Sequence, residues 1–347
     1  MQGHSSISNF KLIGLYAKTA VFLAVVYIVF SSVGRSYSLA AEENTINAFT
    51  KQRMEEFYEQ PKDTLDTVFI GSSHSYCTFD PEIIDGYLNT SSWQLGTPSQ
   101  HPDTSYYLLR EVFNYQSPKT VVMELYWDVL DDEFEPKQAD SLFEVLKNKE
   151  LKEEYIAEVF PLGDKVKYSL PAIRFQQDYS AYEASKMEKE IEEKYGVSKK
   201  ETEKANGVEY YQGRGYVYCD ITMPQSEYDR TNQFKYFNGK DWDFNSTQKK
   251  YVEKIIELCK EKDAKLIFVT APVANVSMDF IENYHKVNQK VSDFAKENGI
   301  PYLDYNIVNS EENLLTNENF RDDAHLNHSG VEIVDKHFAQ WIKEGAK

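Results

Sequence analysis

The order of short apolar runs and amphipathic stretches along the chain constrains its fold most strongly. Runs rich in β-branched and aromatic residues predict strands at Thr67–Ile70, Thr120–Leu125, Lys265–Pro272 and Ile300–Tyr305, with a shorter strand ending at Gly96. Stretches with helical periodicity predict helices at Pro81–Leu88, Asp103–Tyr115, Ser246–Glu261 and Asp279–Asn298, and a last one from about His328. Strands that alternate with helices predict a mainly parallel sheet covered on both faces. Right-handed crossovers then give a three-layer α/β/α sandwich.

The amino end contains a long apolar segment, Leu12–Gly34, in which Lys18 is the only charge. A helix needs about 20 apolar residues to cross a membrane, so the segment predicts a single-pass anchor if Lys18 snorkels towards the headgroups. Lys11 and Lys18 lie before its uninterrupted apolar part, Thr19–Val33, and Glu42 and Glu43 follow it, which places the amino end in the cytoplasm. A cleaved signal peptide is the alternative, because Ser38–Ala40 resembles a cleavage site. Both interpretations place the body of the chain outside the cytoplasm.

The remaining sequence predicts an α/β domain interrupted by an insertion. The predicted parts are a tail and anchor (1–41), a stalk or helix (42–66), the first part of the domain (67–130), the insertion (131–245) and the second part (246–347). The insertion is charged and helix-rich at first and then rich in tyrosine and glycine. Because loops of this length are uncommon in compact domains, we expect a subdomain or a lid over the site.

Composition excludes several classes of function. A net charge of −18 argues against nucleic acid, whose phosphates require clustered Lys and Arg. Three cysteines cannot make a disulfide framework, and no CxxC motif or Cys/His cluster predicts zinc. The sequence therefore predicts neither a metal nor a bound cofactor.

Polar residues follow the predicted strands at one edge of the sheet, where ligands bind in open parallel sheets. Gly71-Ser72-Ser73 follows the first strand, Gly96 ends the second, and the loop Phe320–Gly330 precedes the last helix. That loop contains an acid and a histidine three residues apart, in the stretch "RDDAHLN". We therefore expect a serine, a histidine and an acid to meet at this edge.

These residue types have the roles that acyl transfer needs. A serine hydroxyl is a weak nucleophile at neutral pH, so His325 would take the proton of Ser73. Asp322 would fix the tautomer of His325 and stabilise its imidazolium form. Asp323 is the alternative acid, and the D-x-x-H spacing favours Asp322. The backbone N–H groups of Ser73 and Gly96 would stabilise the oxyanion.

The pattern of these motifs resembles the SGNH/GDSL hydrolase superfamily, which has a flavodoxin-like fold. The matching features are G-x-S after the first strand, a glycine after the second, and D-x-x-H-L-N-x-x-G near the carboxyl end. The resemblance covers Thr67 to the end apart from the insertion. It implies that Ser73 is the nucleophile, Asp322 and His325 the acid and base, and Gly96 an oxyanion donor.

The anchor together with "GSSH", "QLGTPSQ", "APV" and "DDAHLN" is similar to a narrower branch of that superfamily. This branch comprises membrane-anchored, extracytoplasmic O-acyltransferases related to alginate O-acetyltransferases and to the D-alanine transfer protein of lipoteichoic acid. The resemblance implies transfer of an acyl group, here acetyl, to a cell-surface polysaccharide or wall polymer. It also implies a membrane-bound O-acyltransferase as a partner that exports the acyl group.

One departure from the superfamily pattern leaves alternatives open. The stretch "ELYWDVL" lacks the asparagine that the superfamily usually places after the third strand. Gln100, Tyr126 or Trp127 would then supply the third oxyanion donor, and Gln100 is also a candidate for substrate binding. An esterase or deacetylase of the same fold, or a non-catalytic subunit that binds or assembles polysaccharide, are the other hypotheses.

Overall fold

The computed structural model describes residues 5–44, 48–134, 142–143, 145–174, 205–206 and 209–346. Much of the predicted insertion, including 175–204, lies outside the described residues. The chain divides into two compact units, one made of 1–46 and 160–198 and the other of 47–159 and 199–347.

The first unit contains a long helix, α1 (Ser5–Asn44), with α9 (Leu162–Ser169) and α10 (Pro171–Arg174). Within the described part of the chain, Leu12–Gly34 of α1 is the one segment long and apolar enough to cross a membrane. Its side chains from Leu12 to Val33 are exposed, as those of a lipid-facing helix would be. The predicted apolar helix is therefore confirmed, and its insertion into a membrane stays a prediction.

The second unit is built on a five-stranded sheet. Its strands are β1 (Thr67–Ile70), β2 (Ser92–Gln94), β3 (Thr120–Glu124), β7 (Lys265–Thr270) and β8 (Tyr302–Asp304). They lie in the order β2-β1-β3-β7-β8, and every neighbouring pair is parallel. The predicted parallel α/β fold is confirmed.

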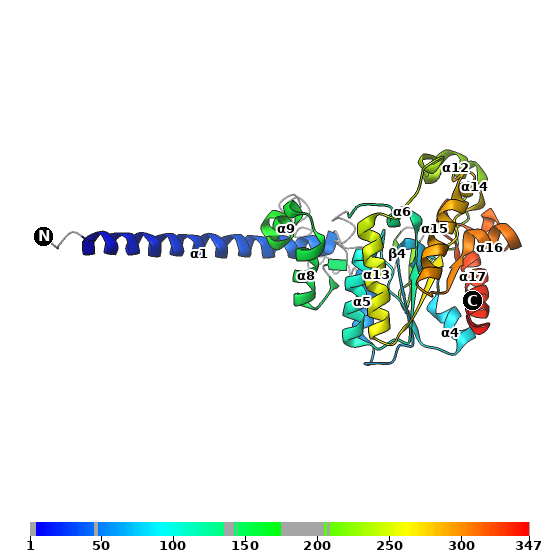
Figure 1. The fold of residues 1–347 in the computed structure, drawn as a ribbon, viewed down its shortest axis with the longest axis horizontal. Helices are drawn as coiled ribbons and strands as arrows, with labels where there is room; N and C mark the ends of the chain where they lie inside the picture. Colours follow the sequence, from blue (N-terminus) through cyan, green and yellow to red (C-terminus); the bar gives the residue numbers. More distant parts are fainter. Residues whose placement is uncertain are drawn as a thin grey trace, which may run out of the picture. The chain divides into compact units, whose positions relative to one another are not determined.

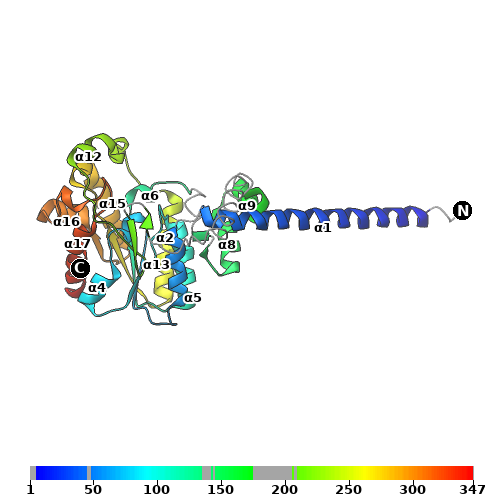
Figure 2. The ribbon, with the colours of Figure 1, turned by 180° about the vertical axis from the view of Figure 1, so that it is seen from behind.

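Helices cover both faces of this sheet (Figure 1). One face packs against α2 (Ala48–Glu59), α5 (Pro102–Tyr115), α13 (Ser246–Glu261) and α15 (Tyr284–Glu297), and Figure 2 shows α2 beside α5. The other packs against α4 (Pro81–Leu88), α16 (Tyr305–Glu312) and α17 (His328–Lys343). Successive strand residues point to opposite faces, so Val68 and Ile70 join the first core and Phe69 the second.

The helix expected at Asp279–Asn298 begins later, at Tyr284. A short helix, α14 (Asn275–Met278), precedes it and ends where the N–H of Asp279 bonds to the carbonyl of Ser277. The N–H of Tyr284 then closes a turn on the carbonyl of Ile281. The buried side chain of Ile281 anchors this turn in the first core, so the chain changes direction before α15.

The tyrosine-rich part of the insertion forms a hairpin on the edge strand β2. The strands β4 (Ala205–Asn206), β5 (Glu209–Gly213) and β6 (Tyr216–Tyr218) make a small antiparallel sheet. The backbone of Gln94 donates to the carbonyl of Arg214 at 2.9 Å, and buried Arg53 donates to the carbonyl of Gly215 at 2.9 Å. A Cβ at Gly215 would lie 2.0 Å from the carbonyl oxygen of Gln94, so only glycine fits there.

Other elements in or beside the insertion also belong to the second unit. Helix α6 (Trp127–Leu130) follows β3, and α8 (Lys149–Val159) joins α5 through an ion pair between Arg110 and Glu154. Helix α12 (Gln225–Thr231) and the 3₁₀ helix η2 (Gln233–Phe237) pack near α14, where the side chain of Asn232 donates to Ser277 Oγ at 2.8 Å.

Candidate functional site

The end of β1 leads into a tight turn that presents Ser73. Gly71 has a φ of 143°, and a Cβ there would lie 2.7 Å from the Cβ of Glu124, so the turn requires glycine. Ser72 caps the short helix α3 (Ser73–Tyr76), because its Oγ accepts the N–H of His74 at 3.2 Å. Ser73 is therefore the first helical residue, and it is partly exposed at the carboxyl edge of the sheet.

His325 and Asp322 lie in a short loop before α17. Phe320 and Leu326 close this loop by pairing as an antiparallel bridge. Inside it, Asp322 Oδ1 accepts the backbone N–H groups of Ala324 at 2.8 Å and of His325 at 2.7 Å. These two bonds fix the carboxylate beside the imidazole, which is a local consequence of the D-x-x-H spacing.

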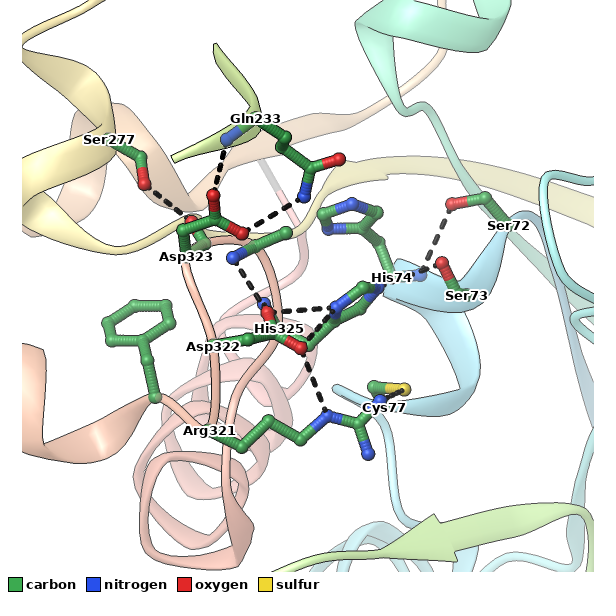
Figure 3. Close-up of polar contacts among 12 residues, drawn as sticks. Ser72, Ser73, His74, Cys77, Gln233, Ser277, Arg321, Asp322, Asp323 and His325 are labelled. Atoms are coloured by element: carbon green, nitrogen blue, oxygen red, sulfur yellow. Dashed lines mark hydrogen bonds and ion pairs between the residues drawn. The ribbon is translucent and has the colours of Figure 1, made fainter. Parts of the chain in front are cut away.

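The three predicted side chains meet at the sheet edge (Figure 3). Nε2 of His325 lies 2.9 Å from Ser73 Oγ, and Nδ1 of His325 lies 3.0 Å from each carboxylate oxygen of Asp322. A carboxylate only accepts hydrogen bonds, so Nδ1 carries the proton and Nε2 is free to accept from the serine hydroxyl. The contacts thus form one chain from the acid to the serine.

Asp322 is held in its ionised form. Burial by itself would raise the pKa of Asp322, but His325, the backbone N–H groups and Arg321 together bring that pKa well below its ordinary value. Arg321 Nε lies 3.7 Å from the Asp322 carboxylate, and the same guanidinium pairs with Glu209 at 2.8 Å. Asp322 therefore carries a negative charge throughout the neutral range.

The neighbouring acid, Asp323, points in a different direction (Figure 3). Its carboxylate accepts the backbone N–H of Gln233 and, at 3.2 Å, the Gln233 side-chain amide. Its backbone carbonyl accepts from Ser277 Oγ. Of the two acids that the sequence leaves as candidates, Asp322 is the one in contact with the imidazole.

Gly96 and Gln100 lie beside the Ser73 turn, and their polar groups bond to the protein. The N–H of Gly96 donates to Gln94 Oε1 at 2.9 Å, and a Cβ at Gly96 would lie 2.9 Å from the carbonyl oxygen of Ser72. Gln100 is buried, and its Oε1 accepts the N–H of Gly71 at 3.1 Å. Its amide nitrogen donates to two further acceptors in the loop that follows β2. Both residues therefore brace the turn in this structure.

A stack of rings adjoins His325, and no sequence pattern marks it. The ring of His74 lies between those of Tyr126, at 4.0 Å between centroids, and His325, at 4.6 Å. Burial, with a smaller contribution from His325, holds the pKa of His74 well below its ordinary value, so its ring is neutral. Trp127, a candidate oxyanion donor by sequence, is buried with its ring 5.1 Å from that of Tyr284.

Glu124 is a second residue beside the turn that belongs to none of the sequence motifs. Its Oε2 accepts the N–H of Ser72 at 3.1 Å and the Ser72 hydroxyl at 2.8 Å. Burial raises the pKa of Glu124 to about 7. The available signal is an acid near the end of the otherwise apolar run "TVVMEL", because acids are seldom buried unless they have a partner or a function.

Neither the thiol near the turn nor a cluster of metal ligands provides an alternative reactive centre among the described residues. Cys77 is buried, accepts a hydrogen bond from Arg321 at 2.9 Å, and has its pKa raised to about 12 by burial, so its thiol is a poor nucleophile. Within the residues that the structure describes, no three His, Cys, Asp or Glu side chains are grouped so that they would hold a metal ion.

Comparison with known proteins gives one family. A family model described as "Protein of unknown function (DUF1574)" matches residues 23–330. No curated protein matches the sequence. A GDSL-like lipase from Bacteroides thetaiotaomicron is 13% identical, with 86% of this chain and 98% of that chain covered and a TM-score of 0.37. A protein of the G-D-S-L family from Desulfitobacterium hafniense is 12% identical, with 79% and 97% covered and a TM-score of 0.37.

Proposed function

Because the chain belongs to the DUF1574 family, whose description assigns no function, we propose its function from the site itself: it is a serine-dependent acyl-transfer enzyme. Ser73 is the nucleophile, His325 the general base and acid, and Asp322 the residue that orients the imidazole. The observation that carries this proposal is the 2.9 Å contact between His325 Nε2 and Ser73 Oγ, with Asp322 on the opposite nitrogen.

The reaction proceeds in two halves through an acyl-enzyme. In the first, Ser73 Oγ attacks the acyl carbonyl carbon and its proton passes to His325 Nε2. The donor's ester bond then breaks, and the leaving oxygen takes the proton from His325. In the second, an acceptor hydroxyl gives its proton to His325 and attacks the acyl carbon. The Ser73–acyl bond breaks, and the proton returns to Ser73.

The oxyanion of each tetrahedral intermediate requires donors beside Ser73. The N–H of Ser73 is suited to this role, because the first N–H groups of a helix have no partner within it. The N–H of Gly96 already donates to Gln94 Oε1, so it would contribute only if that bond were exchanged. Tyr126 remains a candidate for the third donor, since its ring adjoins the stack on His325.

The acceptor that we propose is a hydroxyl of a cell-surface polysaccharide or wall polymer, and the acyl group is acetyl. The apolar segment Leu12–Gly34 supports this, because an anchored enzyme whose body lies outside the cytoplasm works beside such polymers. The acyl group would be supplied across the membrane by a partner such as a membrane-bound O-acyltransferase. With water as the acceptor, the same site would be an esterase or deacetylase.

Acetyl transfer from an activated ester tests this function. The full-length chain in detergent is incubated with p-nitrophenyl acetate, with and without oligosaccharides of cell-surface polymers, beside Ser73→Ala. We expect Ser73-dependent release of p-nitrophenol, and acetylated oligosaccharide detected by mass spectrometry. Release of acetate alone in the presence of every acceptor would favour the esterase. Absence of any Ser73-dependent reaction, together with binding of the oligosaccharides, would contradict catalysis and favour a binding subunit.

A further inference from the structure

A buried carboxyl group lies directly beneath the turn that presents Ser73. Glu124 ends β3 and is only 4% exposed. It is so close to the turn that a Cβ at Gly71 would lie 2.9 Å from its Oε2. The acyl-transfer steps described above do not use it.

The hydrogen bonds of Glu124 build the turn on both sides of Ser73. Its Oε2 accepts both the N–H and the hydroxyl of Ser72, the residue before the nucleophile. The Ser72 hydroxyl oxygen in turn accepts the N–H of His74, the residue after it. Ser73 therefore lies between two residues whose backbone N–H groups are fixed by one network that ends on Glu124.

The surroundings of Glu124 offer no positive charge to its carboxyl group. Within the described residues, burial raises the pKa of Glu124, and the two hydrogen bonds from Ser72 lower that pKa by a smaller amount. On β7 its partner in register is the apolar Val269, and β1 carries no ionisable side chain. Tyr126, which follows β3, interacts electrostatically with Glu124, and burial keeps Tyr126 and the His74 ring stacked on it uncharged near neutral pH.

The charge of Glu124 matters because of where the oxyanion forms. The neutral acid satisfies Ser72 without any counter-charge, and burial raises its pKa to about 7. The ionised form would put an unpaired negative charge behind Ser73, close to the negative charge of the tetrahedral intermediate. Like charges repel strongly where water is excluded, so ionised Glu124 would destabilise the transition state.

We propose that Glu124 is a positioning residue that holds the Ser73 turn as a neutral acid, and that a negative charge at this position slows acyl transfer. This inference rests on the proposed function, because it concerns the nucleophile of that same site. Glu124 acts through Ser72 and does not touch the substrate.

The pH dependence of Glu124→Gln against wild type tests the proposal. Glutamine keeps a carbonyl oxygen for the two Ser72 donors and cannot ionise. With the full-length chain in detergent and p-nitrophenyl acetate as substrate, we expect similar kcat/KM values at pH 6. The ratio of kcat/KM for the variant to that for wild type should then rise through about pH 7 and reach roughly tenfold by pH 8.5, because only wild type acquires a negative charge at this position. Glu124→Ala, which lacks the acceptor, should lose roughly tenfold or more relative to wild type at pH 6, and this deficit should shrink towards pH 8.5 as wild type ionises.

Thermal unfolding supplies a measurement that does not depend on activity. Folded Glu124 binds its proton more tightly than the unfolded chain, whose glutamate pKa is 4.5. Its favourable contribution to stability is therefore complete below pH 4.5 and is lost as the pH rises through about 7. The unfolding temperature of Glu124→Gln should rise relative to wild type over this range.

Failure of the proposal for Glu124 and failure of the proposed function would give different results. A flat ratio of kcat/KM with Ser73-dependent turnover intact would overturn the role of Glu124 and leave the proposed function standing. An unfolding difference that does not change with pH would overturn the role of Glu124 whether or not the substrate is turned over. If Glu124→Gln does not fold, a wild-type kcat/KM that stays level from pH 7 to pH 8.5 would overturn it instead. Loss of all Ser73-dependent turnover would overturn both proposals.

Discussion

Replacing Ser73 with alanine is expected to lower kcat/KM for p-nitrophenyl acetate by about ten-thousand-fold or more, while the chain stays folded. The reason is that the hydroxyl forms the bond to the acyl group, and no other nucleophile shares its contact with His325 Nε2 at 2.9 Å within the described residues. Ser73 is partly exposed at the sheet edge, so removal of its hydroxyl leaves no buried cavity. Esterase assays and circular dichroism of the purified variants measure both parts of this expectation.

Ser75→Ala is the matched control for Ser73→Ala. Ser75 lies in the same short helix and is buried, and its hydroxyl donates to Gln94 Oε1 at 3.1 Å rather than towards His325. The Gln94 oxygen still accepts the N–H of Gly96 after that change, so activity should stay within a few-fold of wild type. If Ser73→Ala retained esterase activity close to that of Ser75→Ala, Ser73 would not be the nucleophile.

Replacing Asp322 with asparagine is the second large expected effect. An asparagine amide donates to Nδ1 of His325 where the carboxylate accepts, so the ring would carry its proton on Nε2. It could then no longer accept the proton of Ser73, whose Oγ lies 2.9 Å from that nitrogen. In serine proteases the same change costs about ten-thousand-fold in kcat. We expect a loss of about one-thousand-fold or more in kcat with little change in KM, measured by steady-state kinetics.

Asp323→Asn is the control for this substitution. It changes the adjacent carboxyl in the same way, but the Asp323 side chain bonds to Gln233 and does not contact His325. Asparagine keeps one of the two oxygens that accept from Gln233, so stability should fall slightly while kcat remains within a few-fold of wild type. Equal losses in the two variants would mean that the loop, rather than the orientation of His325, was disturbed.

The arrangement of the sheet was predictable because it follows from residue patterns that act over short distances. Runs such as Thr120–Leu125 are apolar on both faces, which is typical of a strand with helices on each side. The start of α15 was not predictable in this way. Residues from Asp279 keep a helical pattern, and the turn before Tyr284 depends on burial of Ile281 against a core made by distant segments.

The residues of the candidate site also fall into two groups, those marked by a local sequence signal and those placed by contacts between distant segments. Ser73, Asp322 and His325 were predictable because each follows a recognisable local signal, a strand end or the D-x-x-H spacing, and parallel strands bring such ends to one edge. The positions of Glu124 and His74 were not predictable from spacing. Glu124 reaches Ser72 across 52 residues, and the His74 ring stacks on a histidine that arrives from the far end of the chain.

Gly96 shows that a local sequence pattern does not reveal which acceptors compete for a backbone N–H group. The sequence places its N–H at the correct edge of the sheet for an oxyanion donor. In the structure this N–H already donates to Oε1 of Gln94, the last residue of β2, which lies two residues before Gly96. The direction of the Gln94 side chain is set by its hydrogen bonds to Ser75 of α3, and no sequence motif predicts it.

The most direct test of the central claim, that Ser73 forms an acyl-enzyme, is to locate the acyl group on the protein. The full-length chain is mixed with p-nitrophenyl acetate, quenched in acid within the first turnover, digested and mapped by mass spectrometry. We predict one acetyl group on the peptide that contains Ser73, absent from Ser73→Ala and strongly reduced in His325→Ala. Rapid turnover with no acetyl group at Ser73, or with the label on another residue such as Cys77, would contradict it.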